Sequence, residues 1–100
     1  MAVYVLSPEA LEDLQNIWDF VASDSVNAAS KLQDRLFDAF ESLARFPGQG
    51  HTRTDLTSRS VRFWPVGAYL VAYRLHRDML QIVAVLHGAR DVAVVLRQRS

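Results

Sequence analysis

Residues 87–91 of this 100-residue chain, with the sequence HGARD, form a polar cluster between two apolar stretches. Cleavage of RNA by attack of its own 2′-hydroxyl needs a base, an acid and a cation that holds the phosphate. His87 and His51 are the candidates for proton transfer, and the candidate phosphate ligands are Arg62, Arg74 and Arg90. The alternative is a structural turn, in which the histidine bonds to the backbone and Gly88 permits a sharp change of direction.

Other catalytic chemistries lack their sequence patterns. The three histidines, His51, His76 and His87, are far apart in the sequence, and the chain has no cysteine. Neither a histidine cluster nor a thiolate site for a metal is therefore expected. No glycine-rich phosphate-binding loop and no Gly-x-Ser-x-Gly motif occurs. The sequence predicts neither a metal site nor a cofactor.

The charge of the chain is unevenly distributed although its formal net charge is zero. Residues 1–48 hold three basic and eight acidic residues, and residues 49–100 hold eight basic and three acidic ones. Ten of the eleven basic residues are arginine, which suits bidentate pairing with carboxylates and phosphates. The two halves form either solvated faces of opposite sign or a basic surface for an acidic partner. Zero net charge argues against unspecific phosphate binding, and no direct sequence-specific binding of nucleic acid is expected.

The length and composition predict one folded domain over residues 1–100, since half of the residues are apolar. The N-terminal residues lack the basic and apolar regions of a signal peptide, and no apolar run is long enough to span a membrane. The absence of cysteine fits a reducing compartment. These features predict a soluble cytoplasmic protein.

Two amphipathic helices are predicted in the first half of the chain. The first begins at Pro8 with Ser7 as its N-cap, and the second is capped by Asp24 or Ser25. The apolar stripe of the first helix consists of Leu11, Leu14, Ile17, Trp18 and Val21, with acidic Glu12, Asp13 and Asp19 off that stripe. The stripe of the second helix consists of Ala29, Leu32, Leu36, Ala39, Phe40 and Leu43, extended by Phe46. The short link between them predicts an antiparallel helical hairpin.

Strands are predicted on both sides of this hairpin. Residues 2–6 form a short strand, and after one long polar loop over residues 47–60 an antiparallel meander follows, with strands at 61–66, 68–75 and 79–87. Pro65 places the first strand of the meander at an edge or at a bulge. Phe63 and Trp64 flank Arg62 and are able to stack on bases, but alternation must send one of them inward, which favours packing.

The C-terminal residues 89–100 are expected to form a short helix rather than an extension of the last strand. They either dock on the sheet or extend as a basic arm that contacts a partner. The predicted fold class is α+β, with an N-terminal strand and an antiparallel helical hairpin packed on a mostly antiparallel sheet, and a short C-terminal helix or arm.

Three stretches carry a resemblance to a known family: LSPEALEDLQNIWDF (6–20), GHTRTDLTSRSVRFWPVGAYLVAYR (50–74) and IVAVLHGARDV (82–92). The chain resembles the ParE branch of the ParE/RelE superfamily, the toxins of bacterial type II toxin–antitoxin systems. The resemblance implies the fold predicted above and a ParD-type antitoxin whose C-terminal segment wraps around the toxin. It implies two possible activities, because ParE-like toxins poison DNA gyrase whereas RelE-like toxins cut mRNA on the ribosome.

The residues of the RelE-like nuclease site are incomplete here. In those nucleases a basic residue follows the Gly-x-Tyr of the middle strand, where this chain has Leu70 after residues 67–69. Arg90 matches the arginine at the end of the last strand, but Leu96 stands where a tyrosine is expected. The lysines of the nuclease site are also missing, since Lys31 is the only lysine. Each acid or base is worth roughly 10²–10⁴-fold in rate, so the resemblance implies a protein that is not an enzyme.

The HGARD segment is then a structural corner formed by His87, Gly88 and Asp91, in which Arg90 and Asp91 pair locally or with Arg62 and Asp55. The candidate target-binding residues lie in the loop His51–Arg59 and the C-terminal arm, and are His51, Arg53, Arg59, Arg90, Arg97 and Arg99. The candidate antitoxin-binding residues are Leu14, Trp18, Arg62, Trp64 and Arg74.

The main interpretation is a toxin that inhibits DNA gyrase by binding and is neutralised in a hetero-oligomer with a ParD-type antitoxin. By analogy with the family, this assembly is expected to have a 2:2 core or a multiple of it. The alternative is a ribosome-dependent mRNA endonuclease that uses His87, Arg90 and Arg62, with His51 in place of the missing tyrosine. A third interpretation is a binding module that has lost its toxicity.

Overall fold

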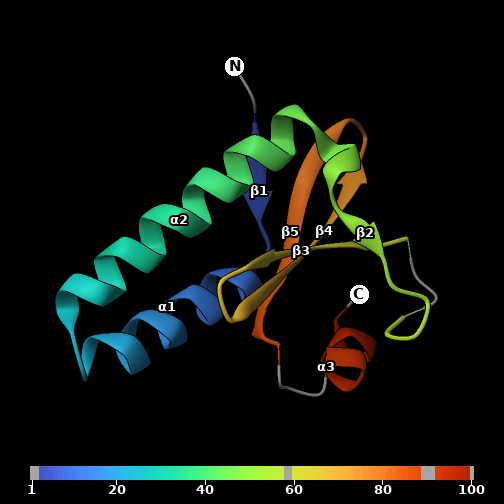
Figure 1. Ribbon diagram of the computed structural model, residues 1–100. Coiled ribbons are helices and arrows are strands. Elements are labelled where there is room, and N and C mark those ends of the chain that lie inside the picture. Colours follow the sequence, from blue (N-terminus) through green and yellow to red (C-terminus); the bar gives the residue numbers. More distant parts are fainter. Residues whose placement is uncertain (1–2, 58–59, 89–91, 100) are drawn as a thin grey trace.

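A computed structural model describes residues 3–57, 60–88 and 92–99. They form three layers: a helical hairpin, a five-stranded sheet and a short C-terminal helix (Figure 1). The elements in chain order are β1 (Tyr4–Leu6), α1 (Pro8–Ala22), α2 (Val26–Arg45), the 3₁₀ turn η1 (Pro47–Gln49), β2 (His51–Thr52), β3 (Arg62–Val66), β4 (Tyr69–His76), β5 (Met79–His87) and α3 (Val92–Gln98). The strand order is β1-β5-β4-β3-β2. Strand β1 is parallel to β5 and the other pairs are antiparallel, so the predicted α+β fold is confirmed.

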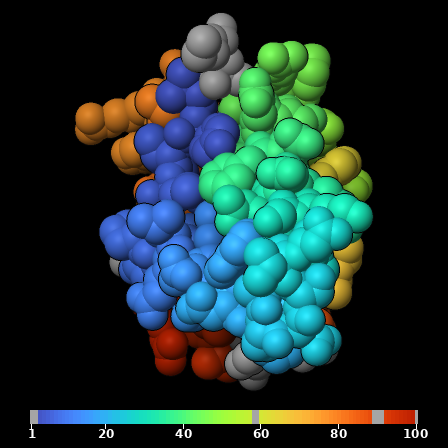
Figure 2. Space-filling model, turned by 90° about the vertical axis from the view of Figure 1, so that its left-hand side faces the viewer, coloured from blue at the N-terminus to red at the C-terminus, as the bar shows by residue number. Residues whose placement is uncertain are grey.

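The helical hairpin covers one face of the sheet, and its two helices form the surface seen in Figure 2. Helix α1 begins where the Ser7 hydroxyl accepts a hydrogen bond of 3.0 Å from the backbone N–H of Ala10. Helix α2 begins in the same way, with the Ser25 hydroxyl accepting a bond of 3.1 Å from Ala28. The N-cap predicted for the first helix is confirmed, and Ser25 rather than Asp24 caps the second.

Two apolar clusters hold the layers together, one on each face of the sheet. The first lies between the hairpin and the sheet, with Leu36, Phe40, Leu43, Val71, Tyr73 and Ile82 among its buried members. The second lies under α3 on the opposite face and is formed by Val61, Phe63, Ala72, Val83, Ala84, Leu86, Val92 and Leu96. Helix α3 is therefore docked on the sheet, which confirms the predicted final helix and decides against a free basic arm.

The predicted helical stripes are correct except at two ends. Leu11 is 59% exposed and Phe46 is 64% exposed. On α1 it is Ala10, with Leu14 and Ile17, that packs against the core, which leaves Leu11 facing solvent. Phe46 has left helical geometry, with φ −131° and ψ 73°, because the chain turns there into the Pro47–Gln49 turn. The spacing of apolar residues alone does not show at which end of a helix the apolar stripe stops packing against the sheet.

The segment 47–60 is not one long loop, because it contains η1 and the two-residue strand β2. Strand β2 pairs only with Arg62 and Phe63 of β3. Pro65 lies past the end of β2, so among the described residues it has a strand partner on the β4 side and none on the β2 side, where its missing N–H costs no hydrogen bond. Strand β3 lies between β4 and β2, so it is not the edge strand predicted from Pro65, but β2 is so short that the part of β3 holding Pro65 has a free edge. Trp64 packs toward the hairpin and Phe63 is buried on the opposite face, which confirms packing as their structural role.

Candidate functional site

The corner between β4, β5 and α3, where the nuclease site would lie, is occupied by apolar side chains. Leu96 is 2% exposed within the second apolar cluster, and Leu70 packs against the same cluster. By the resemblance to RelE-like nucleases, the position of Leu70 would carry a cation and that of Leu96 a tyrosine. Neither side chain transfers a proton or holds a phosphate. Arg90 and Asp91, the other predicted residues of this corner, lie outside the described residues.

The remaining candidate nuclease residues are not brought together. His87 pairs with Tyr69 at one end of the sheet, and their rings meet edge to face with centroids 5.6 Å apart. Arg62 is opposite Tyr73, four positions further along β4. At about 3.3 Å per residue this separation is roughly 13 Å along the strands. His51 lies on β2 and stacks on Trp64 with ring centroids 6.5 Å apart, so these residues do not converge on one reacting group.

Arg62 has a structural partner that its sequence context did not predict. Its Nη1 donates a hydrogen bond of 2.9 Å to the backbone carbonyl of Gly50. Asp55 pairs with Arg53 instead, at 2.7 Å, and both side chains are exposed. The hydrogen bond from Arg53 lowers the pKa of the Asp55 carboxyl. The predicted pairing of Arg90 and Asp91, locally or with Arg62 and Asp55, involves two residues that lie outside the described part of the chain and stays a prediction.

Tyr73 of β4 holds the segment that contains Gly50 through its hydroxyl group. Its hydroxyl donates a hydrogen bond of 2.6 Å to the carbonyl of Pro47 and accepts one of 2.8 Å from the N–H of Gly50. Burial raises the pKa of this phenol, so the neutral hydroxyl that serves both bonds is maintained. Gly50 is thus held through its N–H by Tyr73 and through its carbonyl by Arg62, which fixes the start of β2 at His51.

Asp13 and Arg99 form an ion pair that joins helix α1 to the C-terminus of the chain. The two N–O distances are 2.6 and 2.9 Å, and the side chains are 12% and 18% exposed. Asp13 also accepts a hydrogen bond of 2.9 Å from the backbone N–H of Val85, on the edge of β5 that the short β1 leaves open. The hydrogen bonds that Arg99 donates to the Asp13 carboxylate raise the pKa of Arg99.

This pair corrects one prediction and adds a residue that was missed. Arg99 was expected in an exposed arm that contacts a target, but it is tied to Asp13 and largely covered. Asp13 was identified only as an acidic residue off the apolar stripe. The two positions are 86 residues apart, and no periodicity or spacing signals a contact over that distance.

The other predicted contact residues are distributed over both sides of the sheet. His51 and Arg53 are exposed near β2, and Arg97 is exposed on α3. Arg74 is half-buried on β4, where its Nε donates a hydrogen bond of 2.7 Å to Gln81. Arg59 lies outside the described residues.

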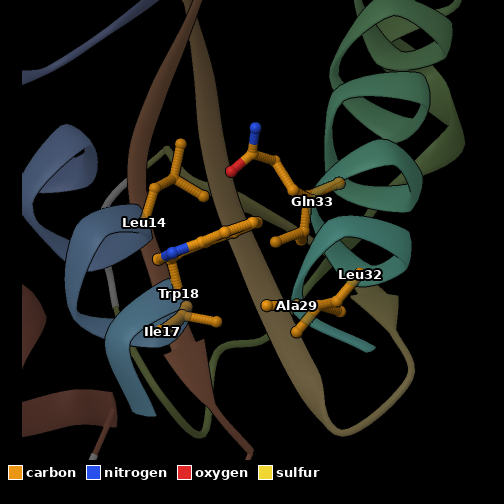
Figure 3. A pocket seen from close by; sticks show the side chains of 7 residues that line it. Leu14, Ile17, Trp18, Ala29, Leu32 and Gln33 are labelled. Carbon is orange, nitrogen blue, oxygen red and sulfur yellow. The ribbon is translucent and has the colours of Figure 1, made fainter. Parts of the chain in front are cut away.

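A groove runs along the outer surface of the hairpin between α1 and α2. It has a volume of about 720 Å³ and is lined by Pro8, Leu11, Glu12, Leu14, Gln15, Trp18, Gln33 and Phe37. Below it, Leu14, Ile17 and Trp18 of α1 face Ala29, Leu32 and Gln33 of α2 around a cavity of only about 10 Å³ (Figure 3). The predicted contact residues Leu14 and Trp18 therefore form the firmly packed floor of an open, largely apolar groove.

The described parts of the chain contain no group of three or more residues suited to hold a metal ion. Nor does any of their helices combine the length and the apolar character needed to cross a membrane.

Comparison with known proteins places these features in a family. The family model described as the ParE toxin of the type II toxin–antitoxin system parDE matches residues 4–92. Toxin RelE2 of Caulobacter vibrioides is 33% identical over 90 residues, which cover 90% of this chain and 99% of that protein. Toxin ParE3 of the same organism is 29% identical, with 88% of each chain covered.

A solved structure described as the chromosomal ParDE toxin–antitoxin system from P. aeruginosa has the same fold. Its TM-score is 0.72 at 20% sequence identity, and the match covers 87% of this chain and 96% of that one. The family match extends over most of the sequence, and the layers and strand order agree with the fold that the resemblance implied. The chain therefore belongs to the ParE toxin family of type II toxin–antitoxin systems.

Proposed function

We propose that this toxin acts without catalysis, by binding and inhibiting DNA gyrase, and that a ParD-type antitoxin neutralises it. The observation that carries the first part is the apolar corner, in which Leu70 and Leu96 occupy the positions of two catalytic groups. A nuclease would have to replace both groups from elsewhere. His87 and Arg62, which the alternative would use, are opposite Tyr69 and Tyr73 of β4, four positions apart along the strand.

The proposed target surface lies on the side of the sheet that carries α3. Leu56, in the segment after β2, and Val95 of α3 pack against the same second cluster, so these two elements share one side of the molecule (Figure 1). Exposed cations lie on both of them, at Arg53, which is paired with exposed Asp55, and at Arg97. Arg59 and Arg90 belong to adjoining segments of the sequence.

The proposed antitoxin surface includes the groove between α1 and α2. Its floor is apolar and aromatic, and its rim carries Glu12, Gln15 and Gln33. A groove of this kind suits the apolar face of an amphipathic segment, with anchoring residues set between two helices. The family to which the chain belongs consists of toxins that are paired with an antitoxin, which supports this assignment.

The first experiment is a pair of parallel assays on toxin freed from its antitoxin. One contains DNA gyrase and relaxed plasmid, and the other contains translating ribosomes and labelled mRNA. We expect loss of supercoiling, or trapped cleaved DNA, while the mRNA stays intact. Cut mRNA with normal supercoiling would overturn the proposal and assign catalysis to the corner. No effect in either assay, with antitoxin binding retained, would indicate a module without toxicity.

The variant His87→Ala is expected to keep full toxicity. His87 is exposed at the end of β5 and meets Tyr69 edge to face, which is a structural contact. The measurement is growth arrest on expression and inhibition in the assay above, with the melting temperature as a control for folding. A variant that folds normally but has lost all toxicity would contradict a purely structural role.

The variant Trp18→Ala is expected to weaken binding of the antitoxin by roughly 30-fold, since a central aromatic anchor in a groove is worth about 2 kcal/mol. Titration calorimetry with the antitoxin encoded beside the toxin measures the change. Val26→Ala is the matched control, because Val26 is 63% exposed at the start of α2 and does not line the groove. Equal affinities of the two variants would place the antitoxin elsewhere.

A further inference from the structure

The sheet face opposite the hairpin is only partly covered. Helix α3 packs over the part that contains Ala72, Ala84 and Leu86. Arg74 and Gln81 form a cross-strand pair on β4 and β5, and Gln81 is opposite Val5 of the edge strand β1. Beside this row lies a hollow of about 490 Å³, lined by Ser60, Val61, Arg74, Leu75, His76, Val83, Leu96 and Arg99.

The described residues that line the hollow include cations and no carboxylate. Arg99 is paired with Asp13, whereas the guanidinium of Arg74 has no carboxylate partner within residues 3–57, 60–88 and 92–99. Its Nε is engaged by the Gln81 side chain at 2.7 Å, and no carboxylate of the described residues pairs with it. The bond to Gln81 orients the guanidinium and leaves the edge formed by its two Nη groups for a further acceptor.

The structure distinguishes Arg74 from Arg62, which the sequence presented as equivalent candidates. Arg62 already donates to the carbonyl of Gly50 and holds the segment before β2. Arg74 makes no such contact with the backbone of another segment. Its neighbours in the hollow include Val61, Leu75, Val83 and Leu96, whose apolar surfaces reduce the screening of a charge by water.

We propose that this hollow receives an acidic side chain of the antitoxin, whose carboxylate binds the Nη edge of Arg74. This inference rests on the proposed function, because it assigns a second contact to the same partner. A carboxylate is favoured because it matches the planar fork of arginine with two parallel hydrogen bonds. The hairpin carries most of the acidic residues and the sheet side most of the arginines, so a complementary partner needs its acidic stretch here.

The position of the hollow gives the contact a role in neutralisation. The hairpin groove lies on the opposite side of the sheet from the proposed target surface. An antitoxin bound only in that groove would leave the target surface open. A segment that also reaches Arg74 passes the short edge strand β1, one strand away from the Arg74–Gln81 pair, and ends beside α3. Antitoxin and target would then compete for the same side of the molecule.

The test is the affinity of full-length toxin variants for the antitoxin encoded beside the toxin, measured at two salt concentrations. Arg74→Gln is expected to bind at least tenfold more weakly, with a smaller dependence on salt. Arg74→Lys keeps the charge but loses the fork, and is expected to recover part of the affinity. Arg45→Gln is the matched control, because Arg45 is an exposed cation at the end of α2 whose partner is Glu41.

The outcomes separate this inference from the proposed function. Failure of the unmodified toxin to bind the antitoxin would overturn both. Normal binding that is unchanged in Arg74→Gln and Arg74→Lys would overturn only the acidic contact. Unchanged antitoxin binding with lost inhibition of gyrase would assign the hollow to the target instead, which also contradicts the proposal. Loss of affinity in both variants, with melting temperatures equal to that of the unmodified protein, would support it.

Discussion

Asp13→Ala is expected to lower the free energy of unfolding by about 3 kcal/mol, the largest single loss predicted for a charged residue of this chain. The substitution removes both bonds to Arg99 and the acceptor of the Val85 N–H. Arg99 would keep its charge in a site where only 18% of its side chain is exposed. An uncompensated cation at this depth, together with an unpaired backbone N–H, accounts for the size of the effect.

The measurement is thermal or urea unfolding, in which a loss of this size lowers the melting temperature by roughly 15 °C for a domain of this length. Asp19→Ala on the same helix is the control, because Asp19 is exposed and the bond that its carboxylate accepts comes from the exposed side chain of Gln15. The double variant Asp13→Ala, Arg99→Ala should lose less than the sum of its single changes, since it leaves no stranded charge. Equal stability of Asp13→Ala and the control would contradict the role assigned to this pair.

The helices were predictable because their signals are local. A serine followed by proline, and apolar residues at three- and four-residue spacing, give the same structure in almost any context. Ser7 and Ser25 act as the caps that their types suggest. The strands of the meander follow from the same kind of signal, since short connections leave antiparallel pairing as the simple arrangement.

The long-range parts of the structure were not predictable from one sequence. Strand β1 pairs in parallel with β5, which joins residues more than seventy positions apart. Because β1 is only three residues long, it leaves part of the β5 edge to Ser7 and Asp13, whose side chains complete the hydrogen bonding there. These contacts depend on how two layers are placed, and local patterns do not carry that information.

The candidate site divides in the same way. The resemblance to RelE-like nucleases, together with the identities of Leu70 and Leu96, was enough to predict that nuclease chemistry is incomplete, because matching a family pattern needs only residue types. Their shared burial in one cluster, and the different partners of Arg62 and Arg74, required the register of the sheet. The sequence does not distinguish arginines on neighbouring strands. Only their hydrogen-bond acceptors in the structure show that one arginine holds the backbone of another segment and that the other is open to a partner.

Gly50→Ala is expected to cost about 3 kcal/mol of unfolding free energy for a purely steric reason. The backbone of Gly50 has φ −71° and ψ 168°, which any residue adopts, so conformational freedom is not the issue. A Cβ atom at this position would lie less than 3 Å from the Tyr73 hydroxyl and from two carbon atoms of its ring. Relief requires Tyr73 to move, which breaks its bonds to Pro47 and Gly50 and disturbs a fully buried ring.

Gly48→Ala is the matched control, because a Cβ at Gly48 meets nothing within 4 Å and little change in stability is expected. In the Tyr73→Phe background the cost of Gly50→Ala should fall, although not to zero, since the ring carbons still crowd the added methyl group. The same displacement moves His51, so inhibition of gyrase should weaken in Gly50→Ala at temperatures where the variant is folded. A Gly50→Ala protein as stable as Gly48→Ala would show that Tyr73 is free to move, and would remove the physical basis for a fixed contact surface at the start of β2.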